Sequence, residues 1–368
     1  MSARIPAEVF PPGEFIKDEL EARGWTQVDL AEVLGRPAKL VSELLAAKRQ
    51  ITPQTATGLA EAFGTEPQFW MNLESAYQLS KTNQQDNLVA RRSRLYAKVP
   101  VKELVRRGWI ESTDSVDVLE SRVLKFLEIK SIDEEPASVA YAAKATPGER
   151  PLAQVLWQLR CKQIARRQLV TKYSEGRLRS AVDHFRKLLI DPADIGSVAR
   201  VLQECGVRLV VVEALPGSKI DGACFWLDDD SPVVALSNLH DRIDNFWFVL
   251  RHEIEHVLRR DGAVVDTDLG SNDPNASEQE RIANSAAGDF CVPKEKLDNW
   301  ILRKGRFLSE ADLLGFASVN RVHPGIVAGQ LCKRTGNHKR FSKHRVKVRQ
   351  VLIATAPVDG WGEIYPAD

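Results

Sequence analysis

Hydrophobic residues recur at helical spacing through the first eighty residues of the chain. Five helices are predicted there, over 14–23, 27–34 and 38–46 and from Pro53 and Pro67 onward. A short turn containing Gly35 separates the second helix from the third. Two short helices joined in this way are typical of a helix-turn-helix motif. Residues 1–80 are therefore expected to form a compact all-α domain.

Longer amphipathic stretches follow, at 116–128, 152–170 and 178–190. Their apolar residues recur with the period of a helix, so they should pack on one another. We expect residues 81–190 to form a helical connector.

The pattern then changes to short apolar runs at 207–213, 222–227 and 232–237, which predict strands. The acidic turn at 228–230 joins the last two into a hairpin. Helical spacing returns at 245–258, from Ser277, and at 309–318 and 324–335.

We therefore expect a multidomain protein. Its parts would be the helix-turn-helix bundle, the connector, a small α+β domain with a short sheet over 191–335, and a C-terminal tail over 336–368. A strand edge of the hairpin could hold an extended peptide by strand addition.

Composition agrees with a globular protein of several domains, because the 368 residues are 43% hydrophobic and 27% charged. The five cysteines form no Cys-x-x-Cys pair, which argues against a disulfide framework. The first residues lack the apolar run of a signal peptide, and no stretch is apolar enough to span a membrane. We expect a cytoplasmic protein without a membrane partner.

Charge is sorted by region although the net charge is only +1. Residues 226–300 hold seven basic and sixteen acidic residues, whereas 313–358 hold nine basic residues and no acid. The basic segment 333–349 includes Phe341, a mixture found on surfaces that bind single-stranded nucleic acid. A segment that folds against the acidic region explains the same charges, so both interpretations stay open.

Basic side chains also gather at the ends of the third predicted helix, at Arg36, Lys39, Lys48 and Arg49. Positive charge at the ends of a reading helix favours contact with DNA phosphates. Double-stranded DNA is therefore an expected partner. A second copy of the chain is expected as well, since operator half-sites usually come in pairs.

Three segments resemble the HigA-like antitoxin branch of the phage-repressor (XRE) helix-turn-helix family. They are 24–31, 41–45 and 48–53, with the Pro-Gln-Phe-Trp-Met-Asn-Leu run at 67–73. The resemblance implies that Gln27 contacts a phosphate and that Lys39, Leu40 and Ser42 face base edges. Pro37 departs from the family, which often has a capping serine there.

The strongest chemical signal is His252-Glu253-Ile254-Glu255-His256 within the helix predicted at 245–258. Residues four apart lie on one face of a helix, so His252 and His256 can bind a single ion. In a His-Glu-x-x-His motif the glutamate is the general base rather than a ligand, which gives that role to Glu253.

Two histidines do not complete a zinc site, so a third ligand is needed from another element. In the helix predicted from Ser277, Glu280 and Asn284 share one face. We expect Glu280 to be the third ligand and Asn284 to orient a ligating histidine. Asp261, Asp266 and Asp268 could also reach the site, although loop solubility explains these acids equally well.

Residues 246–256, with Glu280 to Asn284 and Cys291-Val292-Pro293, resemble the ImmA/IrrE family of gluzincin-type zinc endopeptidases. The resemblance covers about 195–335 and implies Zn²⁺ held by His252, His256 and Glu280, with Glu253 as catalytic base. Glu255 stands where that family commonly has glycine. It could pair with Arg251 or Arg259, or crowd the site and raise the pKa of Glu253.

Together these signals predict a DNA-binding regulator with a zinc endopeptidase domain that cleaves a partner repressor or antitoxin-like protein. The alternative is a DNA-binding antitoxin or repressor whose zinc domain only senses or binds.

Overall fold

The computed structural model describes residues 9–82, 88–134, 151–262, 264–267 and 276–366. They form two compact units, Met1–Ala90 and Arg91–Asp368. The predicted multidomain fold, with a helical helix-turn-helix part and a part with a small sheet, is confirmed.

The first unit is a bundle of five helices. They are α1 (Pro12–Arg23), α2 (Gln27–Leu34), α3 (Ala38–Leu45), α4 (Pro53–Phe63) and α5 (Pro67–Thr82). Its core is built on Ile16, Leu30, Val41, Leu59 and Trp70, all fully buried. Burial of one apolar face from each helix is what holds so small a bundle together.

A capping box fixes the start of α2. The Thr26 side chain accepts from the Asp29 backbone N–H at 3.2 Å, and Asp29 accepts from the Thr26 N–H at 2.7 Å. Gly35, in the left-handed conformation, ends the helix. Local chemistry therefore sets both ends of the first helix of the motif.

The second unit contains most of the helices in the described part of the chain. They are α6 (Leu88–Lys98), which spans the boundary, α7 (Val101–Arg106), α8 (Val116–Leu127), α10 (Leu152–Arg166), α11 (Glu175–Phe185), α12 (Val198–Cys205), α13 (Ile243–Arg259), α14 (Glu278–Cys291), α15 (Lys294–Lys304), α16 (Glu310–Asn320), α17 (Pro324–Thr335) and α18 (Arg349–Thr355). Short 3₁₀ helices lie at η1 (Arg186–Leu188), η2 (Pro192–Ser197), η3 (Gly305–Phe307) and η4 (Ser342–His344).

A mixed sheet runs through the second unit in the order β4-β2-β3-β1-β5. Its strands are β1 (Arg208–Val212), β2 (Ile220–Trp226), β3 (Pro232–Leu236), β4 (Val264–Thr267) and β5 (Val358–Asp359). The predicted β2–β3 hairpin is confirmed as an antiparallel pair. β1 pairs in parallel with β3 and with β5, and β4 pairs antiparallel with β2.

The expectation that the β2–β3 hairpin has a free strand edge is wrong. β2 is covered by β4 and β3 is covered by β1, so among the described strands only β4 and β5 lie at the edges of the sheet. Sequence analysis identified neither edge strand, because each is very short and pairs with a strand distant in sequence.

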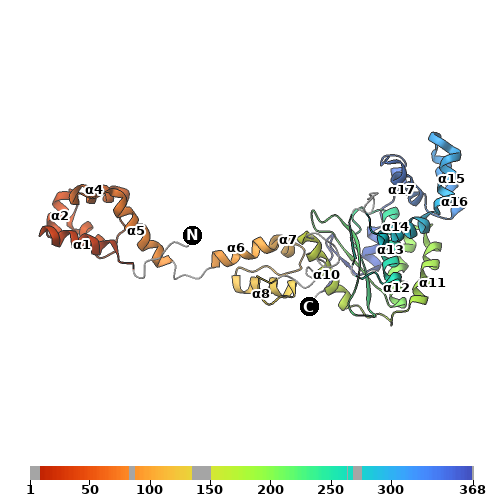
Figure 1. Cartoon of the computed structure of the whole chain (residues 1–368), viewed down its shortest axis with the longest axis horizontal. Coiled ribbons are helices and arrows are strands. Elements are labelled where there is room, and N and C mark those ends of the chain that lie inside the picture. The colour runs from red at the N-terminus through yellow and green to blue at the C-terminus, as the bar shows by residue number, and fades with distance from the viewer. Residues whose placement is uncertain (1–8, 83–87, 135–150, 263, 268–275, 367–368) are drawn as a thin grey trace. The chain divides into compact units, whose positions relative to one another are not determined.

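Helices cover both faces of the sheet. Val211 and Val234 point into a core shared with α12, α13 and α17, while Val210 and Phe225 point into a second core shared with α8 and α10. In Figure 1, α12, α13 and α14 lie on one side of the sheet and α10 on the other. A sheet buried on both faces explains why its strands are apolar runs without alternation.

The segment expected as a connector is part of this layer arrangement, because α8 and α10 supply the second core. Residues expected as a tail also take part. β5 pairs with β1, and the Val346 carbonyl accepts from the Ile243 N–H at the start of α13. Among the described residues, no helix is long and apolar enough to cross a membrane.

A buried ion pair joins β5 to the second core. Arg160 on α10 and Asp359 on β5 are 1% and 0% exposed, with their Nη2 and Oδ2 atoms 2.5 Å apart. Asp359 also accepts from Trp109 Nε1 at 2.6 Å and from the Tyr365 N–H at 3.1 Å. One carboxylate thus collects donors from three segments that are far apart in sequence.

We predict that Asp359→Ala lowers the free energy of unfolding of the second unit by roughly 3–5 kcal/mol, because it leaves the Arg160 guanidinium buried and unpaired. Urea unfolding followed by circular dichroism measures the change. Arg179→Ala is the control, since its exposed pair with Glu175 contributes only about 0–1 kcal/mol. Equal effects of the two substitutions would contradict the prediction.

Candidate metal centre

α13 places both histidines of the motif inside the second unit. Its apolar face buries Trp247, Leu250 and Ile254 in the core shared with the sheet. His252 and His256 point the same way and are 0% exposed. Their Nε2 atoms face each other 3.0 Å apart.

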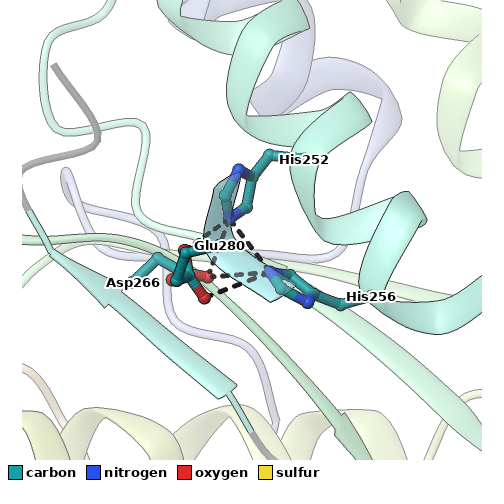
Figure 2. A group of neighbouring side chains, drawn as sticks. All are labelled: His252, His256, Asp266 and Glu280. Carbon is teal, nitrogen blue, oxygen red and sulfur yellow. Dashed lines mark hydrogen bonds and ion pairs between the residues drawn. The ribbon is translucent and has the colours of Figure 1, made fainter. Parts of the chain in front are cut away.

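α14 brings Glu280 to the two histidines. Ser277 caps the helix by accepting from the Glu280 N–H at 3.1 Å, as the sequence predicts. Glu280 Oε2 lies 3.3 Å from His252 Nε2, and its Oε1 lies 3.4 Å from His256 Nε2. Figure 2 shows the three side chains converging from two helices.

The structure adds a fourth side chain, Asp266 on β4, which is 5% exposed. Its Oδ2 lies 3.4 Å from His252 Nε2 and 4.0 Å from His256 Nε2. Ligand atoms of all four residues lie within 4.8 Å of one another.

These distances fit a zinc ion. Zinc bonds of about 2.0–2.1 Å in a tetrahedral arrangement hold neighbouring ligand atoms about 3.3 Å apart. Two imidazole nitrogens and carboxylate oxygens are also the donors that zinc accepts. The residues present therefore fit Zn²⁺, with His252, His256 and Glu280 as the predicted set and Asp266 as an additional donor.

The charges of the cluster attract a cation. Burial alone would lower the pKa of His252, but hydrogen bonds and charges from Asp266 and Glu280 outweigh it and raise the pKa to about 9. Burial likewise favours the neutral form of Asp266, yet the two histidines hold its pKa below the ordinary value. The same field that stabilises a proton on His252 would stabilise a metal ion in its place.

Glu253 lies beside this cluster and is 0% exposed. Neither carboxylate oxygen has a hydrogen bond of ordinary geometry among the described residues. Burial, with the charges of Asp266 and Glu280, raises the pKa of Glu253 well above its usual range. An unpaired buried carboxyl of this kind is suited to accept and return a proton.

Gly222 on β2 makes room for Glu253. A Cβ atom at position 222 would lie 2.3 Å from Glu253 Oε1 and 2.8 Å from Val249 Cγ1, so any larger residue would force these side chains to move. Sequence analysis did not identify this residue, because the contact joins a strand and a helix distant in sequence.

Asp261 orients His256. The Asp261 Oδ2 lies 3.0 Å from His256 Nδ1, and a carboxylate there places the proton on Nδ1 and leaves Nε2 free to bind a metal. The Asn284 Oδ1 is buried with no hydrogen-bond partner among the described residues. Asp261 therefore lies where it can orient His256, and the orienting role expected of Asn284 stays a prediction.

Glu255 does not crowd the site. It pairs with Arg251 at 2.7 Å, one of the two partners expected. The pKa of Glu253 is raised by burial and by carboxylates other than Glu255. Of the three aspartates that could reach the site, Asp261 and Asp266 do lie beside the cluster, whereas Asp268 lies outside the described residues.

The candidate DNA-contacting side chains lie on the solvent side of the first unit. Six are exposed and Leu40 is half-buried against the core: Gln27, Arg36, Lys39, Leu40, Ser42, Lys48 and Arg49. α3 buries Val41, Leu44 and Leu45, which turns Lys39 and Ser42 outward.

Many cations of the basic segment 333–349 are engaged within the second unit. Lys343 pairs with Glu310, Arg334 pairs with Asp298, and Arg340 donates to the Leu308 carbonyl. Asp241 accepts from the N–H groups of Val348 and Arg349. At these positions the segment packs against the second unit, and two of its partners, Asp241 and Asp298, belong to the acidic region 226–300.

Two family models match the chain. A helix-turn-helix model matches residues 16–70, and a model described as an IrrE N-terminal-like domain, a peptidase family, matches residues 205–328.

Curated relatives match over about a fifth of the chain. The HTH-type transcriptional regulator YddM of Escherichia coli is 30% identical over 70 residues, which are 19% of this chain and 74% of the relative. Virulence-associated proteins A' and I of Dichelobacter nodosus are 33% and 34% identical, over 20% of this chain and 65% and 68% of their own lengths.

Solved structures of similar proteins include the Pseudomonas aeruginosa antitoxin HigA with the higBA promoter. It is 34% identical and covers 20% of this chain and 83% of its own, with a TM-score of 0.20. An addiction module antidote protein of the HigA family from Coxiella burnetii is 28% identical. The match covers 29% of this chain and 99% of the Coxiella protein, and the TM-score is again 0.20.

The chain belongs to the family of helix-turn-helix transcriptional regulators. Its second unit carries an IrrE N-terminal-like domain, so a metallopeptidase-family domain follows the helix-turn-helix domain along the chain.

We predict that Asp261→Asn weakens zinc binding by about 10–100-fold, because loss of the carboxylate frees the His256 ring. Competition with a chromophoric chelator measures the affinity. Asn284→Ala is the matched control and should change it little, since Asn284 has no hydrogen bond to either histidine. A larger loss in Asn284→Ala than in Asp261→Asn would show that Asn284 is the orienting residue.

Proposed function

We propose that the chain is a DNA-binding regulator whose second unit is a zinc-dependent endopeptidase. The observation that carries the proposal is the cluster of His252, His256 and Glu280, which holds metal-ligand distances beside the buried, unpaired carboxyl of Glu253. Three protein ligands with an adjacent general base are what peptide hydrolysis at zinc requires.

When bound, Zn²⁺ would supply the Lewis acidity that polarises a scissile carbonyl and makes water more acidic. His252, His256 and Glu280 would hold it, and Asp261 keeps His256 in the binding tautomer. Glu253 accepts a proton from the attacking water and returns it to the leaving amine. The apolar core behind α13 keeps bulk water away from the carboxyl.

A peptide substrate would pair with the open edge of β4. That strand carries Asp266 beside the centre and is paired only with β2 among the described strands. Main-chain pairing along an edge selects extended peptides with little sequence preference. The proposed substrate is therefore a partner protein with an extended segment, such as a repressor or an antitoxin-like protein.

A second candidate function is supported by Asp266. Four protein ligands are typical of structural zinc sites, whereas catalytic sites keep a position free. A centre held by all four side chains would make the unit a metal-binding sensor or binding module rather than a peptidase.

We expect Glu253→Gln to lower the rate of cleavage by about 10²–10⁴-fold while zinc content stays stoichiometric, because the amide cannot accept the proton. Candidate partner proteins encoded by neighbouring genes serve as substrates, with fragments identified by mass spectrometry. Glu255→Gln is the matched control and should retain activity, because Glu255 pairs with Arg251 instead.

A chelator should stop the same cleavage. Stoichiometric zinc without cleavage of any candidate partner would favour the second function over the first.

The first unit is proposed to bind an operator through α3, with α2 contacting the backbone. Support comes from the helix-turn-helix match and from the outward position of Lys39 and Ser42. Two copies would bind paired half-sites.

We predict that Lys39→Ala weakens binding to double-stranded DNA and lowers the slope of log K against log salt by about 1, because one positive charge is lost from the interface. Fragments from the region upstream of the chain's own gene are the probe, measured by fluorescence anisotropy at several salt concentrations. Lys17→Ala on α1 removes an exposed lysine that pairs with Glu14 and should leave the slope unchanged. The same slope for both variants would exclude Lys39 from the interface.

A further inference from the structure

Asp266 is a buried carboxylate aimed into the metal cluster from a strand. It is 5% exposed, and its Oδ2 has no hydrogen bond of ordinary geometry among the described residues. The nearest polar atom of the two histidines is His252 Nε2, at 3.4 Å. A buried carboxylate whose contact with His252 is this long needs a further cation to offset its desolvation.

The sheet directs this side chain toward α13. Asp266 is the register partner of Gly222, and the pairing between β2 and β4 is irregular between Ile220 and Gly222. Register partners point to the same face, and the face at Gly222 is the one that contacts Glu253. A bulge beside a site commonly re-aims one side chain, and here the carboxylate meets His252 and Glu280.

The number of metal-ligand atoms around the centre indicates the role of the Asp266 carboxylate. His252, His256 and Glu280 leave one position of a tetrahedral centre open, and Asp266 Oδ2 lies at ligand spacing from His252. A carboxylate supplied there completes four-coordination and leaves no position for water.

We propose that Asp266 is a fourth protein ligand that closes the metal centre in the resting chain. This inference rests on the proposed metal centre. Turnover then requires the Asp266 carboxylate to rotate away from the metal, while its strand β4 stays paired with β2 at the sheet edge and keeps its open side for a substrate.

The experiment uses the full chain, freed of metal and titrated with Co²⁺, whose visible absorption reports coordination. We expect the wild-type spectrum to be unchanged by azide, because no position is open. In Asp266→Ala, binding should weaken by about tenfold or more, and azide should shift the spectrum by entering the vacated position.

Asp266→Asn keeps the volume of the side chain and guards against collapse of the variant, and circular dichroism checks that both variants fold. Asp261→Asn is the matched control, since it should weaken Co²⁺ binding without making the spectrum respond to azide. The same affinity and the same azide response in wild type and Asp266→Ala would overturn the proposal.

Cleavage of a candidate partner protein gives a second measurement. At saturating metal, Asp266→Ala should cleave faster than wild type because a position for water is open, whereas equal or slower cleavage with full metal content would mean that Asp266 does not block the reaction. If the wild-type chain takes up no stoichiometric Co²⁺ or Zn²⁺, the metal centre itself fails. Metal uptake with an azide-responsive wild type overturns only the fourth ligand.

Discussion

Buried negative charge is the constraint on which the second unit depends. Asp266 and Glu253 are almost completely enclosed, and Glu280 reaches the same point from another helix. Carboxylates removed from water are tolerated only beside a cation or a proton. The two imidazoles offset part of this buried negative charge, and a metal ion at the centre of the four side chains would offset the rest.

The sheet on which the motif helix α13 packs is completed by segments far from the metal motif. The IrrE N-terminal-like match ends at residue 328, yet β5 and α10 lie outside it and complete the sheet and its second core. Asp359 joins them by collecting Arg160 and Trp109 in the interior. The sheet that supports α13 is thus a product of the whole unit rather than of the matched segment alone.

The two units divide the chemistry of the chain. The first has its own core and presents Lys39 and Ser42 outward, as a DNA-reading helix requires. The second presents an edge strand beside a candidate metal centre. A regulator built in this way would bring a cleavage or sensing step to the place where transcription is controlled.

Much of this structure could be predicted from the sequence, because it depends on local chemistry. Helix caps at Thr26 and Ser277 and the four-residue spacing of His252 and His256 depend on neighbours along the chain, so the pattern alone determined them. The β2–β3 hairpin was readable for the same reason. Glu280 was also found from sequence, because helical spacing restricts which acid can share a face with Asn284.

Tertiary structure decided which further carboxylates lie beside the histidines. Asp266 and Asp261 read equally well as loop acids, and only the pairing of β4 with β2 and the end of α13 bring them to the histidines. The requirement for a small residue at Gly222 comes from the close approach of Glu253. Such contacts join residues that are distant in sequence, and no local period or cap encodes which strand will pair with which.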